Sequence, residues 1–100
     1  MYLKIHESAK GIVIAACDKE LMGKILEEGP KIIDLEKYRS FYVGELIDGE
    51  TLQTTLKSKR FNSANLVGEK TVKASVAVGL ITKSDVMKIN GIPYAQIYNL

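Results

Sequence analysis

An uninterrupted run of six apolar residues, Ile12-Val13-Ile14-Ala15-Ala16-Cys17, is the strongest constraint on how this chain can fold. Successive side chains of a strand point to opposite faces of a sheet, so a strand with this composition has no polar face to expose to water. The run therefore predicts a central strand that is covered on both faces. Residues 2–7 alternate, with Leu3 and Ile5 on one side, and we expect them to pair with it as a hairpin through residues 8–11.

Other strand and turn patterns follow along the chain. Residues 24–35 contain a Gly-Pro pair between two apolar pieces and predict a second hairpin, and the Phe-Tyr-Val sequence at 41–43 favours a further strand. Asn90-Gly91 between apolar segments is the strongest short-range hairpin signal. Pro93 has no amide donor, so the strand over residues 92–98 is expected to lie at an edge of the sheet or to begin there.

Two stretches favour helices. Residues 48–57 place two leucines four apart, with acidic residues at the positive end of the helix. Residues 66–80 alternate in part like a strand, but their length and their start and stop residues favour a helix. Asp18 is expected to cap a short helical turn over residues 19–22. The pattern predicts an α+β fold, a mainly antiparallel sheet of hairpins with the two principal helices packed on one side.

The composition places the chain among ordinary globular proteins. With 46% apolar and 26% charged residues it can bury a core, which excludes a disordered chain, and its 100 residues predict a single domain, 1–100. The longest apolar runs fall short of the roughly 18 residues that a membrane span requires, so no membrane partner is expected. A single cysteine cannot form an internal disulfide, which favours a cytoplasmic protein.

Charge is distributed unevenly between the two halves of the chain. Residues 1–50 hold seven Lys and Arg against ten Asp and Glu, a net charge of −3, whereas residues 51–100 hold seven against two, a net charge of +5. Such an asymmetry indicates either a surface that meets phosphate groups or an acidic protein, or simply a solvated face. The cations that would form the surface are Lys57, Lys59, Arg60, Lys70 and Lys73.

The segment at residues 62–71 ends in Gly-Glu-Lys-Thr but does not match a phosphate-binding P-loop, because Glu69 separates the glycine from the lysine. If a helix begins near Asn65, its first amides offer an anion site, Gly68 allows close approach to the backbone, and Lys70 shares a helix face with Lys73. Glu69 already satisfies that positive end in part. The alternative interpretation is a capped helix in which Gly68 is required for packing.

Tyr94, Gln96 and Tyr98 alternate and therefore share one face of the last strand. Aromatic and amide groups in such a row can stack and hydrogen-bond nucleobases. They can equally form a contact between subunits or the half-buried face of an edge strand. No catalytic residue, metal ion or cofactor is expected, because His6 is the only histidine and Cys17 lies in an apolar run, which leaves too few ligands for zinc and no base beside the thiol.

Three stretches resemble a known family, namely residues 2–7, residues 63–70 and residues 91–97, which read Tyr-Leu-Lys-Ile-His-Glu, Ser-Ala-Asn-Leu-Val-Gly-Glu-Lys and Gly-Ile-Pro-Tyr-Ala-Gln-Ile. They are similar to an archaeal family known as domain of unknown function 424, and the resemblance covers nearly the whole chain. It implies a small archaeal cytoplasmic protein with no established activity, cofactor or catalytic residues. The family has His after the proline, where this chain has Tyr94, which argues against a catalytic imidazole there.

Three hypotheses follow. The leading one is a non-catalytic binding protein that contacts RNA, a ribosome-associated protein or another translation-related complex through the five cations and the helix start at residues 65–70. The alternative is a homo-oligomeric or adaptor protein that uses its C-terminal strand as an edge. The third is a small-molecule enzyme built on Asn65, Glu69 and Lys70, which have no evident nucleophile or metal to serve.

Overall fold

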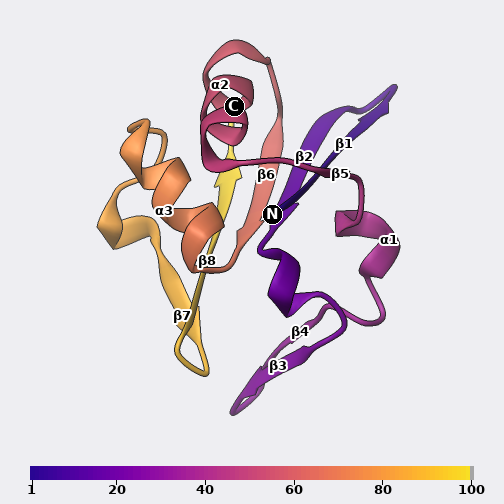
Figure 1. Ribbon diagram of the computed structural model, residues 1–100, viewed down its shortest axis with the longest axis vertical. Coiled ribbons are helices and arrows are strands. Elements are labelled where there is room, and N and C mark those ends of the chain that lie inside the picture. The colour runs from indigo at the N-terminus through magenta and orange to yellow at the C-terminus, as the bar shows by residue number, and fades with distance from the viewer. Residues whose placement is uncertain (100) are drawn as a thin grey trace.

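The apolar run at residues 12–17 lies in the middle of a six-stranded sheet in the computed structural model, which describes residues 1–99 (Figure 1). The order of the strands is β5-β1-β2-β6-β8-β7. Strands β2 and β6 are parallel, and the other pairs are antiparallel, so the α+β class is confirmed with one parallel pair inside the sheet. The strands are β1 (Tyr2–Ser8), β2 (Gly11–Cys17), β5 (Glu45–Leu46), β6 (Ser63–Val67), β7 (Met87–Ile89) and β8 (Ile92–Tyr98).

Two helices, α2 (Gly49–Ser58) and α3 (Glu69–Ala77), pack against each other over one face of the sheet, as expected (Figure 1). Helix α2 begins where the sequence indicated, because the carboxylate of Asp48 accepts the N–H of Thr51 at 2.8 Å. This bond satisfies one of the amides that a helix start leaves without an internal partner.

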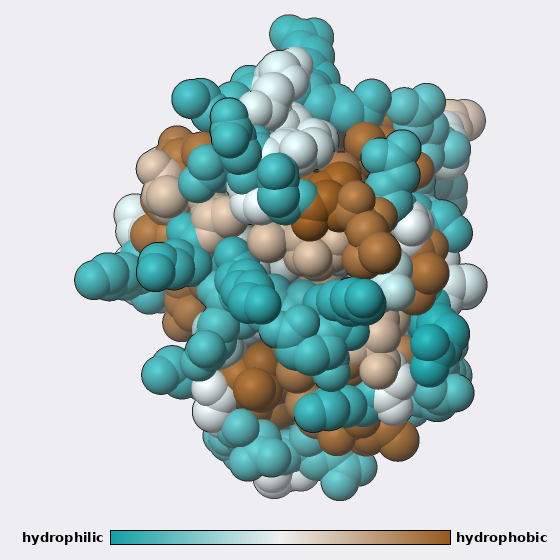
Figure 2. All heavy atoms as spheres, viewed as in Figure 1, coloured by the Kyte–Doolittle hydropathy of each residue, from teal (hydrophilic) through white to brown (hydrophobic). Residues whose placement is uncertain are grey.

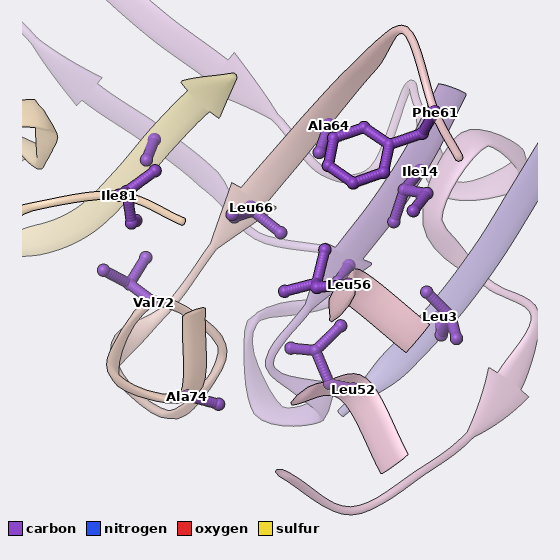
Figure 3. Packing of buried hydrophobic residues seen from close by; sticks show 12 residues of the cluster. Leu3, Ile14, Leu52, Leu56, Phe61, Ala64, Leu66, Val72, Ala74 and Ile81 are labelled. Atoms are coloured by element: carbon purple, nitrogen blue, oxygen red, sulfur yellow. The ribbon is translucent and has the colours of Figure 1, made fainter. Parts of the chain in front are cut away.

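The core beneath these helices is built from alternate residues of the strands. Figure 3 shows Leu52 and Leu56 extending from α2 into this core, next to Leu66 of β6. Leu52 and Leu66 have no exposed surface, and burying a leucine side chain contributes about 1.5–3 kcal/mol. The buried residues of this cluster are Leu3, Ile14, Ala16, Leu52, Leu56, Phe61, Ala64, Leu66, Val72, Ala74, Ile81 and Ala95.

The opposite face of the sheet is covered by a separate hairpin, β3 (Ile25–Glu28) and β4 (Lys31–Asp34), and by the short helix α1 (Arg39–Tyr42) (Figure 1). Because the sheet is covered on both faces, β2 needs no polar face, which is the reason for its composition. The buried residues of this second cluster are Ala15, Cys17, Leu21, Leu26, Leu35, Tyr42, Val67 and Ile89.

Two expected elements differ in the structure. The strand expected at 41–43 is wrong: Phe41 and Tyr42 end helix α1, where the N–H of Phe41 donates to the carbonyl of Tyr38. The β propensity of this segment is overridden because its rings fill space beside the sheet, with Phe41 stacked on His6 at a centroid distance of 4.6 Å. The helix expected over 66–80 begins only at Glu69, because residues 63–67 pair with β2 on one side and β8 on the other.

The C-terminal hairpin is confirmed. Asn90 and Gly91 form its turn with φ angles of 48° and 78°, the left-handed region that these two residues tolerate best. The expected edge position is confirmed only in part: β8 lies between β6 and β7, but β7 pairs with residues 92–94 alone, so among residues 1–99 no strand covers the outer side of residues 95–98. Pro93 is the second residue of β8, so its missing amide falls where the strand begins, the other outcome expected for a proline.

The face of the molecule in Figure 2 is mainly hydrophilic, with apolar side chains gathered in small separate patches. None of the helices within residues 1–99 is both long and apolar enough to cross a lipid bilayer. Large apolar side chains that remain exposed include Ile32 and Tyr38 on the covering layer and Tyr98 on β8. Ile32 and Tyr38 lie at a cleft between that layer and the sheet.

Candidate ligand-binding cleft

A cleft lies between the β3–β4 hairpin with α1 on one side and strands β6 and β8 of the sheet on the other. It consists of two adjoining cavities of about 270 and 360 Å³, a size near the lower end of small-molecule sites. The covering layer thus leaves part of the sheet accessible from outside. The residues that line both cavities are Ile32, Ile33, Tyr42, Asn65 and Gln96.

The floor of the cleft is a pair of side-chain amides. Asn65 of β6 and Gln96 of β8 are directly opposite in the antiparallel register, which places both side chains on the same face. Nε2 of Gln96 donates to Oδ1 of Asn65 at 3.0 Å. Asn65 is half-buried and Gln96 is exposed, so the pair can be reached by a ligand.

This amide pair retains hydrogen-bonding capacity. An amide group offers two donors and an acceptor with two lone pairs, and within residues 1–99 no hydrogen bond uses the Nδ2 of Asn65 or the Oε1 of Gln96. Exchanging oxygen and nitrogen in both side chains gives the same result, one donor group and one acceptor group side by side. The floor therefore complements a planar group that carries an adjacent donor and acceptor.

Aromatic rings border this floor. Tyr94 precedes Gln96 by two residues on the same face of β8, and Tyr42 lines both cavities from α1. Burial, together with the charge that Cys17 would carry, raises the pKa of Tyr42 to about 12, so its hydroxyl remains a hydrogen-bond donor at neutral pH. Tyr38 lines the second cavity and is 53% exposed. The ring of Tyr98, next in the row after Gln96, is also exposed.

Two charged residues lie at the cleft. Lys31 lines the first cavity and is exposed, and within residues 1–99 it forms no ion pair. Asp34 lines the second cavity, but its Oδ1 already accepts the backbone N–H groups of Glu36 and Lys37 at 3.1 and 2.8 Å. Asp34 keeps its negative charge in these bonds, so the cleft has a cation, Lys31, at the first cavity and an anion at the second, and Lys31 is the group that an anionic part of a ligand can contact.

The profile of a family described as "Protein of unknown function (DUF424)" matches residues 6–100. The chain belongs to this family. A crystal structure of an uncharacterized conserved protein from Methanopyrus kandleri has a similar fold, with a TM-score of 0.76 and 22% sequence identity over 97% of this chain and 89% of that chain. At this identity the likeness shows the fold alone. No curated protein matches the chain. The resemblance found in the sequence is confirmed, and the family description carries no activity.

In this DUF424 chain a side chain of the protein itself, Asp18, occupies the anion site expected at residues 65–70. The expectation of a helix start near Asn65 is wrong, because Asn65 is in β6 and Gly68, with a φ of 109°, is the residue before α3. The carboxylate of Asp18 accepts the N–H of Lys70 at 3.0 Å and both the N–H and the hydroxyl of Thr71 at 2.8 Å. An internal carboxylate thus occupies the position proposed for a guest anion.

Gly68 and Asp18 are therefore a packing pair. A Cβ atom on Gly68 would overlap the carboxylate of Asp18, which is 4% exposed. This confirms the packing alternative for Gly68 and corrects the expected role of Asp18, whose side chain makes no hydrogen bond to the short 3-10 helix Lys19–Leu21 that follows it. The sequence did not predict this role of Asp18 because Asp18 and Thr71 are 53 residues apart, and no local pattern indicates a cap at such a distance along the chain.

The five cations do not gather at one place. Lys59 pairs with Glu7 at 3.1 Å, and Arg60 lies beside it before β6, whereas Lys70 pairs with Glu20 at 3.5 Å after β6. The five residues of β6, about 16 Å of extended chain, separate these positions. Lys57 is exposed on the last turn of α2, and Lys73 lines a groove beside α3. The basic surface expected from the sequence is thus divided.

The triplet considered for an enzyme is also separated. Asn65 lies in the cleft, Glu69 lines the groove beside α3, and Lys70 faces Glu20. Within residues 1–99 no three His, Cys, Asp or Glu side chains gather in a way that could hold a metal ion. Burial, followed by the charges of Asp18 and Glu20, raises the pKa of Cys17 to about 12, which keeps the thiol protonated and unreactive.

The structure brings together residues that the sequence suggested for different sites. Asn65, from the expected anion site, meets Tyr94 and Gln96, from the expected partner strand. The sequence did not predict the other side of the cleft. Lys31 lies in the β3–β4 hairpin and Tyr42 in helix α1, and only tertiary packing places these two elements over the sheet. Their one sequence signal was the aromatic composition of residues 38–42.

Proposed function

We propose that this protein binds single-stranded RNA without catalysis and that the cleft holds one unpaired base. The observation that carries the proposal is the Asn65–Gln96 amide pair between tyrosine side chains. Proteins read unpaired bases by hydrogen bonds to their edges and by stacking on aromatic rings, and this floor offers both. The donor and acceptor groups left on the pair correspond to the adjacent donor and acceptor along the edge of a base.

The surroundings of the cleft suit the rest of a nucleotide chain. The exposed ammonium of Lys31 at the mouth can contact a phosphate, and the exposed ring of Tyr98 continues the row beyond Gln96. Residues 94 and 98 are four apart on one strand, about 13 Å, so a base on Tyr98 would not be the base held in the cleft. This arrangement moves the RNA hypothesis from the divided cations to the second face of the sheet.

The test measures the affinity of a fluorescently labelled octauridylate and an octaadenylate by anisotropy. Replacing Gln96 with Ala is expected to weaken the preferred RNA about 5- to 150-fold, because a base-edge contact contributes about 1–3 kcal/mol, and Tyr98→Ala is expected to act similarly through lost stacking. Gln96 and Tyr98 are both exposed, so neither change removes core packing. Thr54→Ala, on the exposed surface of α2, is the control and is expected to leave the affinity unchanged.

Salt dependence gives a second readout. Lys31→Ala is expected to lower the slope of log affinity against log salt concentration by about one, whereas Lys10→Ala, in the exposed β1–β2 turn, is expected to leave it unchanged. The proposal is refuted by the absence of binding at low salt to either RNA, or by binding that Gln96→Ala and Thr54→Ala affect equally. A dimer in sedimentation that buries Tyr98 would instead favour the homo-oligomer alternative.

A further inference from the structure

A second hollow, on the other face of the sheet, is mainly apolar. It has a volume of about 530 Å³ and lies between α3 and the segment that leads through β7 into β8. Val72 and Val76 of α3 line one side, and Val86 and Pro93 line the other. Three of these four are only half-buried, so this groove exposes apolar surface that the core does not use.

One wall of the groove is a single face of helix α3. Its lining residues on α3 are Glu69, Val72, Lys73, Val76 and Ala77, which follow the spacing i, i+3, i+4, i+7 and i+8 of a single helix face. Eight residues of helix rise about 12 Å, which matches the length over which a docked helix presents anchors at i, i+4 and i+7. The groove thus has the length of two helical turns.

The rim of the groove is positive. Lys73 on α3 and Lys83 and Lys88 on the opposite side surround the apolar floor, and all three are exposed. None of them takes part in an ion pair among residues 1–99. Among residues 1–99, Glu69 is the one carboxylate in the lining, so these residues give a local charge of +2, which favours a partner with acidic residues flanking an apolar stripe.

We propose that this groove docks an acidic amphipathic helix of a partner protein, with its apolar side chains against the valines and its carboxylates on the lysine rim. The inference is independent of the RNA proposal, because Pro93 and Tyr94 are neighbours in β8 and point to opposite faces. The apolar floor supplies the driving force, and the lysines determine which helix is accepted and accelerate its association.

The experiment uses the whole chain and a synthetic peptide of about 16 residues, with leucines at i, i+4 and i+7 and glutamates elsewhere on the helix. Binding is followed by the amide chemical shifts of the labelled protein. We expect shifts at Val72, Val76 and Val86, and no binding by the same peptide with lysines in place of glutamates. The double variant Lys73→Glu with Lys88→Glu is expected to weaken the acidic peptide about tenfold or more.

The matched control is Lys10→Glu with Lys57→Glu, which changes the net charge equally at exposed positions outside the groove and is expected to retain binding. Val76→Thr, nearly isosteric, is expected to weaken binding severalfold through the apolar floor alone. Equal losses in the two double variants would overturn the proposal, as would shifts outside the groove. Binding of dodecanoate but not of the peptide would show that the groove is a lipid site. Displacement of the peptide by octauridylate would show that the groove is part of the RNA surface. Either result would also overturn the proposal.

Discussion

Replacing Asp18 with Ala removes the side chain whose carboxylate accepts hydrogen bonds from the start of helix α3 inside the protein. Its carboxylate accepts three hydrogen bonds, one from the N–H of Lys70 and two from Thr71. Thr71 has no exposed surface, so its N–H cannot turn to bulk solvent when the acceptor is lost, and its hydroxyl is left with the Sδ of Met1 at 3.8 Å, a weak acceptor. The cost is therefore greater than that of an ordinary helix cap.

The loss of stability can be worked out from the N–H and O–H donors that lose their acceptor. Each buried donor left without a partner costs about 1–3 kcal/mol, and the part-buried N–H of Lys70 costs less, so Asp18→Ala is expected to lower the free energy of unfolding by about 3 kcal/mol. For a domain of this length 1 kcal/mol shifts Tm by about 4–8 °C, which gives a fall of about 12–24 °C. A domain with about 5–15 kcal/mol of stability remains folded after this loss.

Urea unfolding followed by circular dichroism measures this loss, with Asp48→Ala as the matched control. Asp48 caps the exposed start of α2, where water can replace the carboxylate, so its removal is expected to cost clearly less. Removing Asp18 also leaves the part-buried N–H of Lys70 open to an anion, so sulfate is expected to raise the Tm of Asp18→Ala more than that of the unaltered protein. Equal losses for the two variants, with no differential effect of sulfate, would refute this account of α3.

Three further outcomes are expected. Cys17, with its pKa raised to about 12 by burial, is expected to react with a disulfide reagent at pH 8 only at the rate at which the protein opens, and rapid stoichiometric labelling of the native protein would contradict this. Gly91→Ala is expected to lower the free energy of unfolding by about 1 kcal/mol in a urea titration, because φ is 78° there, while Gly91→Asn is expected to cost less and a neutral Ala variant would refute the turn assignment. Hydrogen bonding from Thr51 lowers the pKa of Asp48 below its usual value of 3.8. The contribution of this carboxylate to the free energy of unfolding is therefore present above pH 3.8 and is lost as the pH falls through the lower pKa of the folded protein. The urea midpoint of Asp48→Asn is expected to fall less between pH 5 and 3 than that of the unaltered protein, and identical pH profiles would contradict this assignment.

Local patterns were sufficient for much of the fold. The apolar run of β2, the alternation of β1 and the Asn90-Gly91 turn each depend on neighbouring residues, and the structure has these elements where the sequence predicted them. The leucines of α2 pack into the core beneath it for the same reason, because helical spacing places them on one face.

The candidate site depended on contacts that no local pattern contains. Asn65 belongs to a strand rather than to a helix because β2 and β8 pair with it on both sides, and tertiary pairing overrides the helix-like features of that stretch. Asp18 reaches α3 across more than 50 residues of chain. The row of Tyr94, Gln96 and Tyr98 was visible in the sequence. The position of the β3–β4 hairpin over the sheet, which forms the other side of the cleft, was not.

The most direct test of the binding cleft follows the side-chain amide signals of Asn65 and Gln96 by NMR as octauridylate and octaadenylate are added. If a base occupies the cleft, these two pairs of signals move together with the backbone amides of Ile32 and Tyr94, and Gln96→Ala reduces the response at Asn65 at the same RNA concentration. Saturating RNA that leaves both side-chain amides unmoved, or shifts only residues near Arg60 or along α3, would contradict the proposal that this cleft binds RNA.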